Sequence, residues 1–347
     1  MSAIQGFKRI LISEEIASTS QARCLMDLAI ADALPVHFSP EDAISTHVLA
    51  ERSGTLIAQA RPSGGWITPA EHGSLAVRPG EHYIHPAIGC VSRCTYCYLL
   101  ARPEGRLPLR LHLRIEELIS AVEELAGNTH CELLFCTGEL ADSLGDAQLW
   151  PAAAILARRF SQGDLGILEL RTKSDRVETL LPVDHNGQTI VAFSLAPESH
   201  IGRYEPVTAS LEQRLAAARA VAECGYPVAF KCEPVVTDVG WREAYLAMFE
   251  RVAASVQPTS IDHVSVGCLR WSQELSEHPM FKKKHGEDVA AGTLIEYRPD
   301  KFNGTLEYEQ RLAVYLGIRQ MINQVGLIAP IWWSLEEPRL LEELNKN

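Results

Sequence analysis

The chain has 347 residues, of which 46% are hydrophobic and 22% charged, enough for one large domain or one domain with an appendage. Its formal net charge of −12 argues against a general phosphate-binding surface, because proteins that bind nucleic acid non-specifically are usually basic. The start of the chain does not resemble a signal peptide and no apolar run has the length of a membrane span, so we expect a cytoplasmic protein without a membrane segment. Disulfides are rare in the cytoplasm, and the nine cysteines therefore favour another role, such as metal binding.

The first eighty residues are expected to form a small α/β extension. Short apolar runs predict strands, and amphipathic segments with polar residues at their start predict helices. In chain order the expected elements are a strand over 9–13, a helix over 20–34, a strand over 35–38 and a helix over 39–51.

From Ala76 the pattern becomes a regular alternation of strands and helices. Strands are expected over 83–89, 131–138, 167–174, 189–195, 227–236 and 263–271, with helices over 114–127, 149–160, 177–181, 210–225 and 241–256 between them. Apolar strands that alternate with amphipathic helices indicate βαβ units and a parallel sheet. Six strands are too few for a closed eight-stranded barrel, so the prediction for 81–272 is a partial (β/α)6 TIM-type barrel. The remaining 273–347 should pack on the barrel as a hairpin with its turn at Asn303-Gly304, in segment 297–309, and a helix over 310–323.

Polar residues stand at nearly every predicted strand exit, where parallel α/β folds place their reacting groups. In chain order these residues are Cys90, Cys94 and Cys97; Cys136, Gly138 and Glu139; Lys173; Ser194; Lys231 and Glu233; and Arg270. We therefore expect one functional site at this end of the barrel.

The segment IGCVSRCTYCYLL (88–100) holds three cysteines in the spacing C-x3-C-x2-C. Four cysteines suit structural zinc or a fully ligated iron–sulfur cluster, whereas three can bind three irons of a [4Fe–4S] cube and leave the fourth open. A zinc site would need a fourth ligand, and His82, His85 and Cys131 are not at a zinc-finger spacing from the triplet. Three unrelated buried cysteines are the remaining alternative, which the polar loop around them disfavours.

This triplet, with a tyrosine before its third cysteine and at the first strand exit, resembles the radical S-adenosylmethionine (SAM) superfamily. Several further segments resemble the spore photoproduct lyase family within it: GCVSRCTYCYL, GDLGILELRTKSDRVETLL, HNGQTIVAFSLAPE, YEPVTASLEQRLAAARAVAECGYPVAF and the later Gly240-Trp241. The resemblance implies that a [4Fe–4S] cluster cleaves SAM to a 5′-deoxyadenosyl radical. It also implies that this radical removes hydrogen from a methylene-bridged dithymine in UV-damaged DNA, which then reverts to two thymines.

The resemblance assigns roles to individual residues of this chain. Cys90, Cys94 and Cys97 match the cluster ligands, Cys136 matches the hydrogen-atom donor, and Tyr96 and Tyr98 match radical-relay tyrosines. Lys173 and Ser194 match positions that contact SAM. Two positions depart from the lyase pattern: Gly138-Glu139 replaces Ser-Asp and is typical of SAM binding in the wider superfamily, and Glu233 replaces a small residue beside the SAM site.

The resemblance further implies a reductant such as flavodoxin or ferredoxin, and DNA carrying the photoproduct as partner. Opening a duplex around a stacked base would need basic contacts. The candidates are Arg298, Lys301 and Asn303 in the hairpin, Lys282, Lys283 and Lys284, and Arg102, Arg106, Arg110 and Arg114. Acidic residues offset the hairpin charges, so a radical SAM enzyme with a different, non-DNA substrate stays an alternative. A non-catalytic metal-binding protein is a second one.

Overall fold

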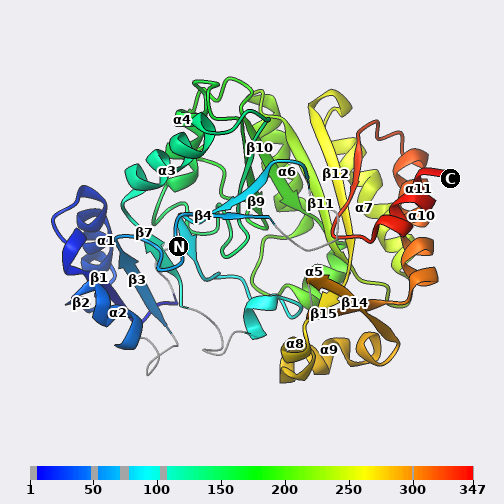
Figure 1. The fold of residues 1–347 in the computed structure, drawn as a ribbon, viewed down its shortest axis with the longest axis horizontal. Coiled ribbons are helices and arrows are strands. Elements are labelled where there is room, and N and C mark those ends of the chain that lie inside the picture. The colour runs from blue at the N-terminus through cyan, green and yellow to red at the C-terminus, as the bar shows by residue number, and fades with distance from the viewer. Residues whose placement is uncertain (1–5, 48–53, 71–77, 102–107, 299–300, 347) are drawn as a thin grey trace.

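A computed structural model describes residues 6–47, 54–70, 78–101, 108–298 and 301–346 of the chain. The N-terminal sheet lies on one side of a central curved sheet, and the C-terminal helices lie on the other (Figure 1). None of the helices in the described ranges is long and apolar enough to cross a membrane.

The N-terminal sheet has the strand order β2-β1-β3-β7-β6. Its strands are β1 (Arg9–Ser13), β2 (Val36–Ser39), β3 (Thr55–Gln59), β6 (Ala87–Ile88) and β7 (Arg110–His112). The helices η1 (Glu14–Ile16) and α1 (Ser20–Ala31) connect β1 to β2, and α2 (Glu41–His47) lies between β2 and β3. The Thr19 side chain accepts a hydrogen bond from the backbone N–H of Ala22 and so caps α1. The predicted elements of 9–47 are confirmed. Because β6 and β7 come from beyond residue 80, this sheet crosses the boundary predicted there, and the division into 1–80, 81–272 and 273–347 stays a prediction.

The central sheet has the strand order β16-β12-β11-β10-β9-β8-β5-β4. Its strands are β4 (Ile67–Pro69), β5 (Glu81–Ile84), β8 (Leu134–Thr137), β9 (Ile167–Thr172), β10 (Thr189–Ser194), β11 (Val228–Val235), β12 (Ile261–Cys268) and β16 (Ile331–Trp333). All pairings are parallel except β4 with β5. Five of the six predicted strands are confirmed. The first, expected over 83–89, is interrupted at Pro86: Tyr83 and Ile84 end β5, whereas Ala87 and Ile88 form β6 of the N-terminal sheet. The central sheet curves into a partial barrel that ends at β4 and β16 in the described part of the chain.

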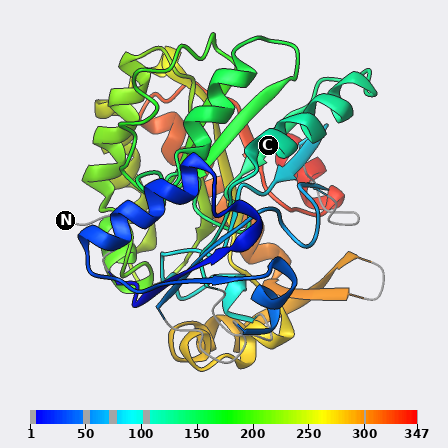
Figure 2. The same ribbon diagram turned by 90° about the vertical axis from the view of Figure 1, so that its left-hand side faces the viewer.

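Helices cover the outer face of the curved sheet (Figures 1 and 2). They are α3 (Ile115–Gly127), α4 (Ala152–Phe160), α6 (Leu211–Glu223), α7 (Trp241–Ser255), α10 (Tyr308–Gln324) and α11 (Pro338–Lys346), with η3 (Pro258–Ser260) before β12. The short helix α5 (Glu198–Tyr204) follows β10 and lies beside the hairpin strands β14 and β15 instead (Figure 1). Phe135 of β8 packs edge-on against Phe160 of α4, with ring centroids 5.6 Å apart. Since neighbouring strand residues face opposite ways, the next residue, Cys136, points into the barrel.

The helix predicted over 177–181 is wrong, because this segment forms consecutive turns between β9 and β10. Leu180 and Leu181 donate backbone hydrogen bonds to the Val177 carbonyl, but Pro182 follows directly. A proline disfavours helical geometry in the residue before it and offers no N–H of its own, so the turn is not continued.

The predicted hairpin forms, with a different turn from the one expected. A three-stranded antiparallel sheet joins β13 (Arg270–Trp271), β15 (Lys301–Leu306) and β14 (Gly292–Arg298), and α8 (Gln273–Glu277) and α9 (Pro279–Ala290) precede it. Asn303 and Gly304 lie within β15, opposite Ile295 and Leu294, so the Asn-Gly pair is not the turn. Gly304 is needed for packing instead, because a Cβ there would lie 1.9 Å from Nε1 of Trp271.

Candidate active site

The cysteine loop leaves the N-terminal sheet after β6 and is held by two other parts of the chain. The backbone N–H of Gly89 donates to the Leu140 carbonyl at 2.8 Å, and that of Thr95 donates to the Tyr204 carbonyl at 2.8 Å. The Thr95 hydroxyl lies 3.1 Å from Nε2 of His285 in α9. The η2 turn (Tyr98–Ala101) then packs into a small apolar cluster formed by Leu100, Leu269, Trp271, Leu275 and Phe281. The loop is therefore fixed between the barrel and the C-terminal segment.

The three thiols of this loop lie close enough to influence one another. Burial raises the pKa of Cys90 to about 12, and the charges of Asp142 and Cys97 add to the effect. Burial also raises the pKa of Cys94, while the ammonium of Lys173 opposes the shift. A [4Fe–4S] cube bonds each thiolate to a different iron, so a loop with three thiols fits a cube with one iron left open.

Cys136 lies inside the barrel at the end of β8 and is fully buried. Its Sγ is 3.1 Å from Nη2 of Arg171 and 3.9 Å from Oε1 of Glu169. Burial raises the pKa of Cys136 well above its usual value, although Arg171 opposes the shift. The thiol thus keeps its proton at neutral pH.

A buried network of charges surrounds this thiol. Arg171 donates to Glu81 at 2.5 Å and to Glu169 at 2.7 Å, and Arg78 donates to Glu169 at 2.5 Å. His263 Nε2 lies 3.7 Å from Glu169. The Glu169 side chain is fully buried, and burial alone would raise its pKa, but Arg171 and its other cationic neighbours lower that pKa. The barrel interior is therefore charged and internally paired.

Sequence reasoning missed this network, although one signal for it exists. The strand Ile167–Thr172 alternates apolar residues with Glu169 and Arg171, a pattern that places both charges on one face. Their partners Arg78 and Glu81 come from a distant segment with no corresponding pattern.

Gly138 and Glu139 follow β8 as predicted. Gly138 has φ +94°, and a Cβ there would lie 2.6 Å from the Arg171 carbonyl oxygen, so the position accepts only glycine. The Glu139 carbonyl accepts a hydrogen bond from the Tyr98 hydroxyl at 2.8 Å, which links this segment to the cysteine loop. Burial raises the pKa of the Glu139 carboxyl, with Arg171 opposing the shift.

Lys173 lies between the cysteine loop and the barrel. Its Nζ is 5.7 Å from the centre of the Tyr96 ring, and its backbone N–H donates to Asp142 at 2.7 Å. Burial disfavours the ammonium, but the charges of Glu205, Cys94 and Asp142 together outweigh burial and the pKa of Lys173 is raised. Glu205 also accepts the Tyr96 hydroxyl hydrogen bond. Lys173 is thus a buried cation beside the cysteine loop.

Ser194 ends β10, and its register partner is Lys231 of β11. The Ser194 carbonyl accepts a hydrogen bond from the buried Arg214 at 2.8 Å. Its side chain is half-buried, at the same end of the barrel as the other predicted residues.

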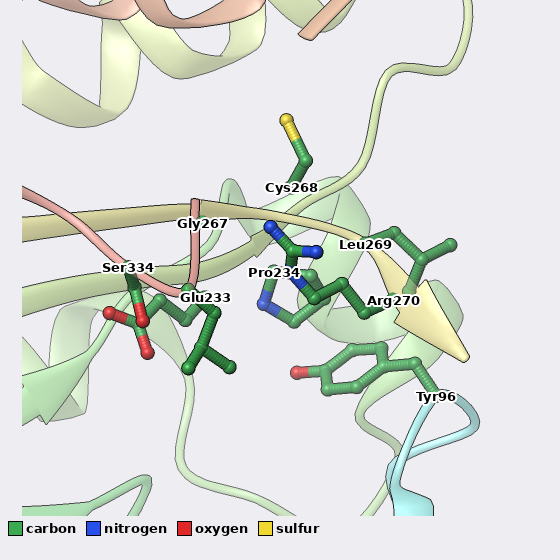
Figure 3. A pocket seen from close by; sticks show the side chains of 9 residues that line it. Tyr96, Glu233, Pro234, Gly267, Cys268, Leu269, Arg270 and Ser334 are labelled. Atoms are coloured by element: carbon green, nitrogen blue, oxygen red, sulfur yellow. The ribbon is translucent and has the colours of Figure 1, made fainter. Parts of the chain in front are cut away.

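A pocket of about 150 Å³ lies at the ends of β11 and β12 (Figure 3). It is lined by Tyr96, Glu233, Pro234, Gly267, Cys268, Leu269, Arg270, Ser334 and Leu335. Glu233 accepts hydrogen bonds from the Ser265 hydroxyl and from Lys231, whose Nζ is 3.2 Å away. Arg270 donates to Glu336 at 2.8 Å, while its Nη1 is buried without a partner among the described residues. The pocket therefore offers a carboxylate, a hydroxyl and a spare guanidinium N–H to a polar ligand.

The predicted DNA contacts are spread over several segments. Lys282 and Lys283 are exposed on α9 and Lys284 is half-buried, while Arg110 is half-buried on β7. Arg114 forms ion pairs with Glu15 at 2.7 Å and Glu117 at 3.0 Å, so it belongs to a surface network. Arg102 and Arg106 lie outside the described residues, as do the side chains of Arg298 and Lys301, and Asn303 lies within β15.

Comparison with known proteins agrees with this arrangement. A family model described as spore photoproduct lyase matches residues 76–278. The spore photoproduct lyase of Bacillus subtilis (strain 168) is 32% identical over 188 residues, which cover 54% of this chain and 55% of that protein. The enzyme of the same name from Geobacillus sp. (strain Y412MC61) is 27% identical over 190 residues, covering 54% and 56%. The matched part thus spans about half the length of these relatives.

Solved structures of spore photoproduct lyase share the fold over almost the whole chain. One, complexed with dinucleoside spore photoproduct, superposes with a TM-score of 0.81 at 20% identity and covers 94% of this chain and 99% of that one. Another, a spore photoproduct lyase mutant with bound AdoMet and dinucleoside spore photoproduct, gives a TM-score of 0.78, with the same identity and coverage. Together with the family match over more than half of the sequence, these findings assign the chain: it belongs to the spore photoproduct lyase family.

Proposed function

We propose that this protein is a radical SAM lyase that reverts a methylene-bridged dithymine photoproduct in DNA to two thymines. The observation that carries the proposal is the buried Cys136 thiol, which lies at a strand exit of the barrel, while the loop that follows β6 holds three cysteines. Similar solved enzymes bind dinucleoside spore photoproduct.

Cys90, Cys94 and Cys97 would hold the [4Fe–4S] cluster, and SAM would lie between this loop and the strand exits. When bound, the two supply a carbon-centred radical that removes a hydrogen atom from the substrate. The Lys173 ammonium is placed to meet a carboxylate.

Glu233 would serve the adenosine part of SAM. Its carboxylate is fixed by Ser265 and Lys231 and lines the pocket that also contains the Tyr96 ring. A hydrogen-bond acceptor held in place on a buried wall suits hydroxyl or amino groups of a ligand.

Cys136 would return a hydrogen atom to the thymine radical. Its S–H bond is weak, and burial keeps the thiol protonated. Its barrel position excludes bulk water, so that the intended donor has no competitor. Tyr96 and Tyr98, which are hydrogen-bonded to Glu205 and to the Glu139 carbonyl, would relay the radical.

Lysines 282–284 and Arg110 would contact DNA phosphates, and a flavodoxin or ferredoxin would supply the electron. A cytoplasmic location accords with this reductant and with nine cysteines that are all free thiols.

A different, non-DNA substrate is the second candidate. The net charge of −12 and the Glu233 carboxylate in the pocket favour it. SAM cleavage without lesion repair, together with no DNA retention at moderate salt, would support this reading.

The test incubates anaerobically reconstituted protein with SAM, a reductant and the methylene-bridged dithymine. We expect thymine as product, and for Cys136→Ala we expect the lesion to be consumed into misquenched products. The matched control is Cys232→Ala, which removes an equally buried cysteine from the outer face of β11. Absence of thymine with the unmodified protein would refute the lyase proposal. An unchanged product distribution for Cys136→Ala would show that Cys136 only packs in the barrel and is not the hydrogen-atom donor.

A further inference from the structure

Trp332 of β16 faces the inside of the partial barrel. Its register partner in β12 is Ser265, whose hydroxyl donates to Glu233, so the indole projects from the face of the sheet that carries this carboxylate. Side chains two residues apart on a strand share a face, and Ser334 lines the pocket together with Glu233 (Figure 3). Trp332 therefore lies one layer below the pocket, on the same wall of the barrel.

This indole keeps contact with solvent although it faces the barrel interior. Trp332 is 40% exposed, whereas Trp150 and Trp271 are 3% and 5% exposed. Strands β16 and β4 are the two edges of the central sheet in the described part of the chain, so the ring stands beside the opening of the partial barrel. A large aromatic ring gains free energy when a ligand covers it. The barrel wall thus presents an aromatic surface that a ligand can reach.

One cation joins this ring to the surroundings of the Cys136 thiol. The guanidinium carbon of Arg78 lies 5.5 Å from the centre of the Trp332 ring, and Arg78 donates to Glu169 at 2.5 Å. Oε1 of Glu169 lies 3.9 Å from Cys136 Sγ. Arg78 precedes β5, near one edge of the sheet, and Trp332 lies on the other edge, so their contact crosses the opening. The cation covers one face of the indole and holds its orientation.

Trp332 is thus near both groups that the reaction has to bring to one substrate. The pocket one layer nearer the strand exits contains Glu233, for which we propose contact with SAM, and Tyr96 of the cysteine loop. The Cys136 thiol, two side chains away from the indole, is the proposed hydrogen-atom donor. A substrate that loses hydrogen to a radical formed in the first place and receives hydrogen from the second has to occupy the space between them.

We propose that Trp332 is a substrate-binding residue on which one pyrimidine ring of the lesion stacks. Nucleobases stack on aromatic side chains in single-stranded or unpaired nucleic acid, and a base that has left the duplex has its faces free to do so. Because Arg78 is already paired with Glu169, the stacked base would meet no uncompensated charge beside the indole. The inference rests on the proposed lyase function, which supplies the dithymine as substrate.

The test compares Trp332→Leu and Trp332→Phe with Trp333→Phe. Trp333 is the next residue of β16 but points to the outer face, where it packs against Tyr315 of α10 with ring centroids 5.0 Å apart. Melting temperature and iron content are measured first, to show that the variants fold and bind the cluster. The KM and kcat for the methylene-bridged dithymine dinucleoside are then measured, together with the affinity for SAM.

For Trp332→Leu we expect the KM for the dinucleoside to rise about tenfold with kcat nearly unchanged, because stacking contributes to binding before and during the reaction alike. The affinity for SAM should stay the same, Trp332→Phe should recover most of the loss, and Trp333→Phe should behave like the parent. A tryptophan that only packs in the barrel would change the melting temperature and not the KM. An unchanged KM, or an equal loss of affinity for SAM, would overturn the assignment.

A second measurement does not depend on the stability of the leucine variant. In protein labelled with fluorotryptophan, the fluorine resonance of Trp332 should shift when the dinucleoside is added and that of Trp333 should not, with both resonances assigned from the phenylalanine variants. No shift at Trp332 in a protein that forms thymine would overturn the inference and leave the lyase function intact. No thymine from the unmodified protein would instead remove the lyase function and this inference with it.

Discussion

Replacement of Arg171 by methionine tests whether the charged barrel interior stabilises the fold. The Arg171 side chain is 13% exposed, and its partners Glu81 and Glu169 are 6% and 0% exposed. Removing one partner from a buried ion pair costs about 3–5 kcal/mol, because the charge left behind is uncompensated. With an unfolding entropy of about 2.1 cal/mol/K per residue, a chain of 347 residues should lose about 4–7 °C in melting temperature.

Arg159→Met is the matched control. Arg159 also pairs with two carboxylates, Glu123 and Asp164, but these are 44% and 57% exposed. Exposed pairs contribute about 0–1 kcal/mol, so this variant should lose no more than about 1.5 °C. Melting is followed by calorimetry on the metal-free proteins under anaerobic conditions. Equal losses in the two variants would refute the reasoning, as would an Arg171→Met protein as stable as the parent.

The pH dependence of this loss follows from Glu169. Its folded pKa is depressed, so its contribution to stability is present above the unfolded value of about 4.3 and is lost as pH falls toward the folded pKa. The penalty of Arg171→Met should therefore be largest near neutral pH and shrink in acid. Adding Glu169→Gln to Arg171→Met should recover part of the loss at pH 7.

Three further variants test other parts of the site and its surroundings. Cys94→Ala should lose bound iron after reconstitution while Cys224→Ala, at an exposed cysteine, keeps it; equal iron contents would argue against the cluster assignment. Glu233→Ala should keep its iron but bind SAM about tenfold more weakly in a titration, because it loses one hydrogen bond to a charged group. An unchanged affinity for SAM would show that Glu233 is not part of the SAM site. Burial raises the pKa of Asp146 to about 8, so the folded protein favours the neutral acid and loses stability as pH rises from about 4 to 8. Asp146→Asn should then melt higher than the parent at pH 8 and not at pH 4, whereas an equal difference at both values would contradict the shift.

Strand positions and strand exits were predictable from the sequence because they depend on local patterns. Apolar runs alternating with amphipathic helices indicate a parallel sheet, and in such a sheet all carboxyl ends meet at one edge. That rule alone predicts that Cys136, Lys173 and Glu233 lie at one end of the barrel, and the structure confirms this position. Their catalytic and binding roles remain predictions.

Other features depend on contacts between distant segments and left little local signal. Strand β16 has three residues and is defined by its pairing with β12, which a periodicity cannot reveal. The Asn303-Gly304 pair has the composition of a turn, but packing against Trp271 decides its place within β15. The contact of Arg78 with Trp332 likewise arises from the curvature of the whole sheet and not from either segment alone.

The position of the cysteine loop has a consequence for how this protein can be divided. The loop begins at β6 and the chain returns through β7, and both strands belong to the N-terminal sheet, whereas Cys136, Lys173 and Glu233 come from the central one. Strand β7 pairs with β3, so a truncation before residue 81 would remove the template on which the cysteine loop is mounted. A minimal barrel cut from this chain would keep Cys136, Lys173 and Glu233 and lose the scaffold of the cysteine loop. The N-terminal unit therefore supports the candidate site, and any transplanted or shortened version has to retain it.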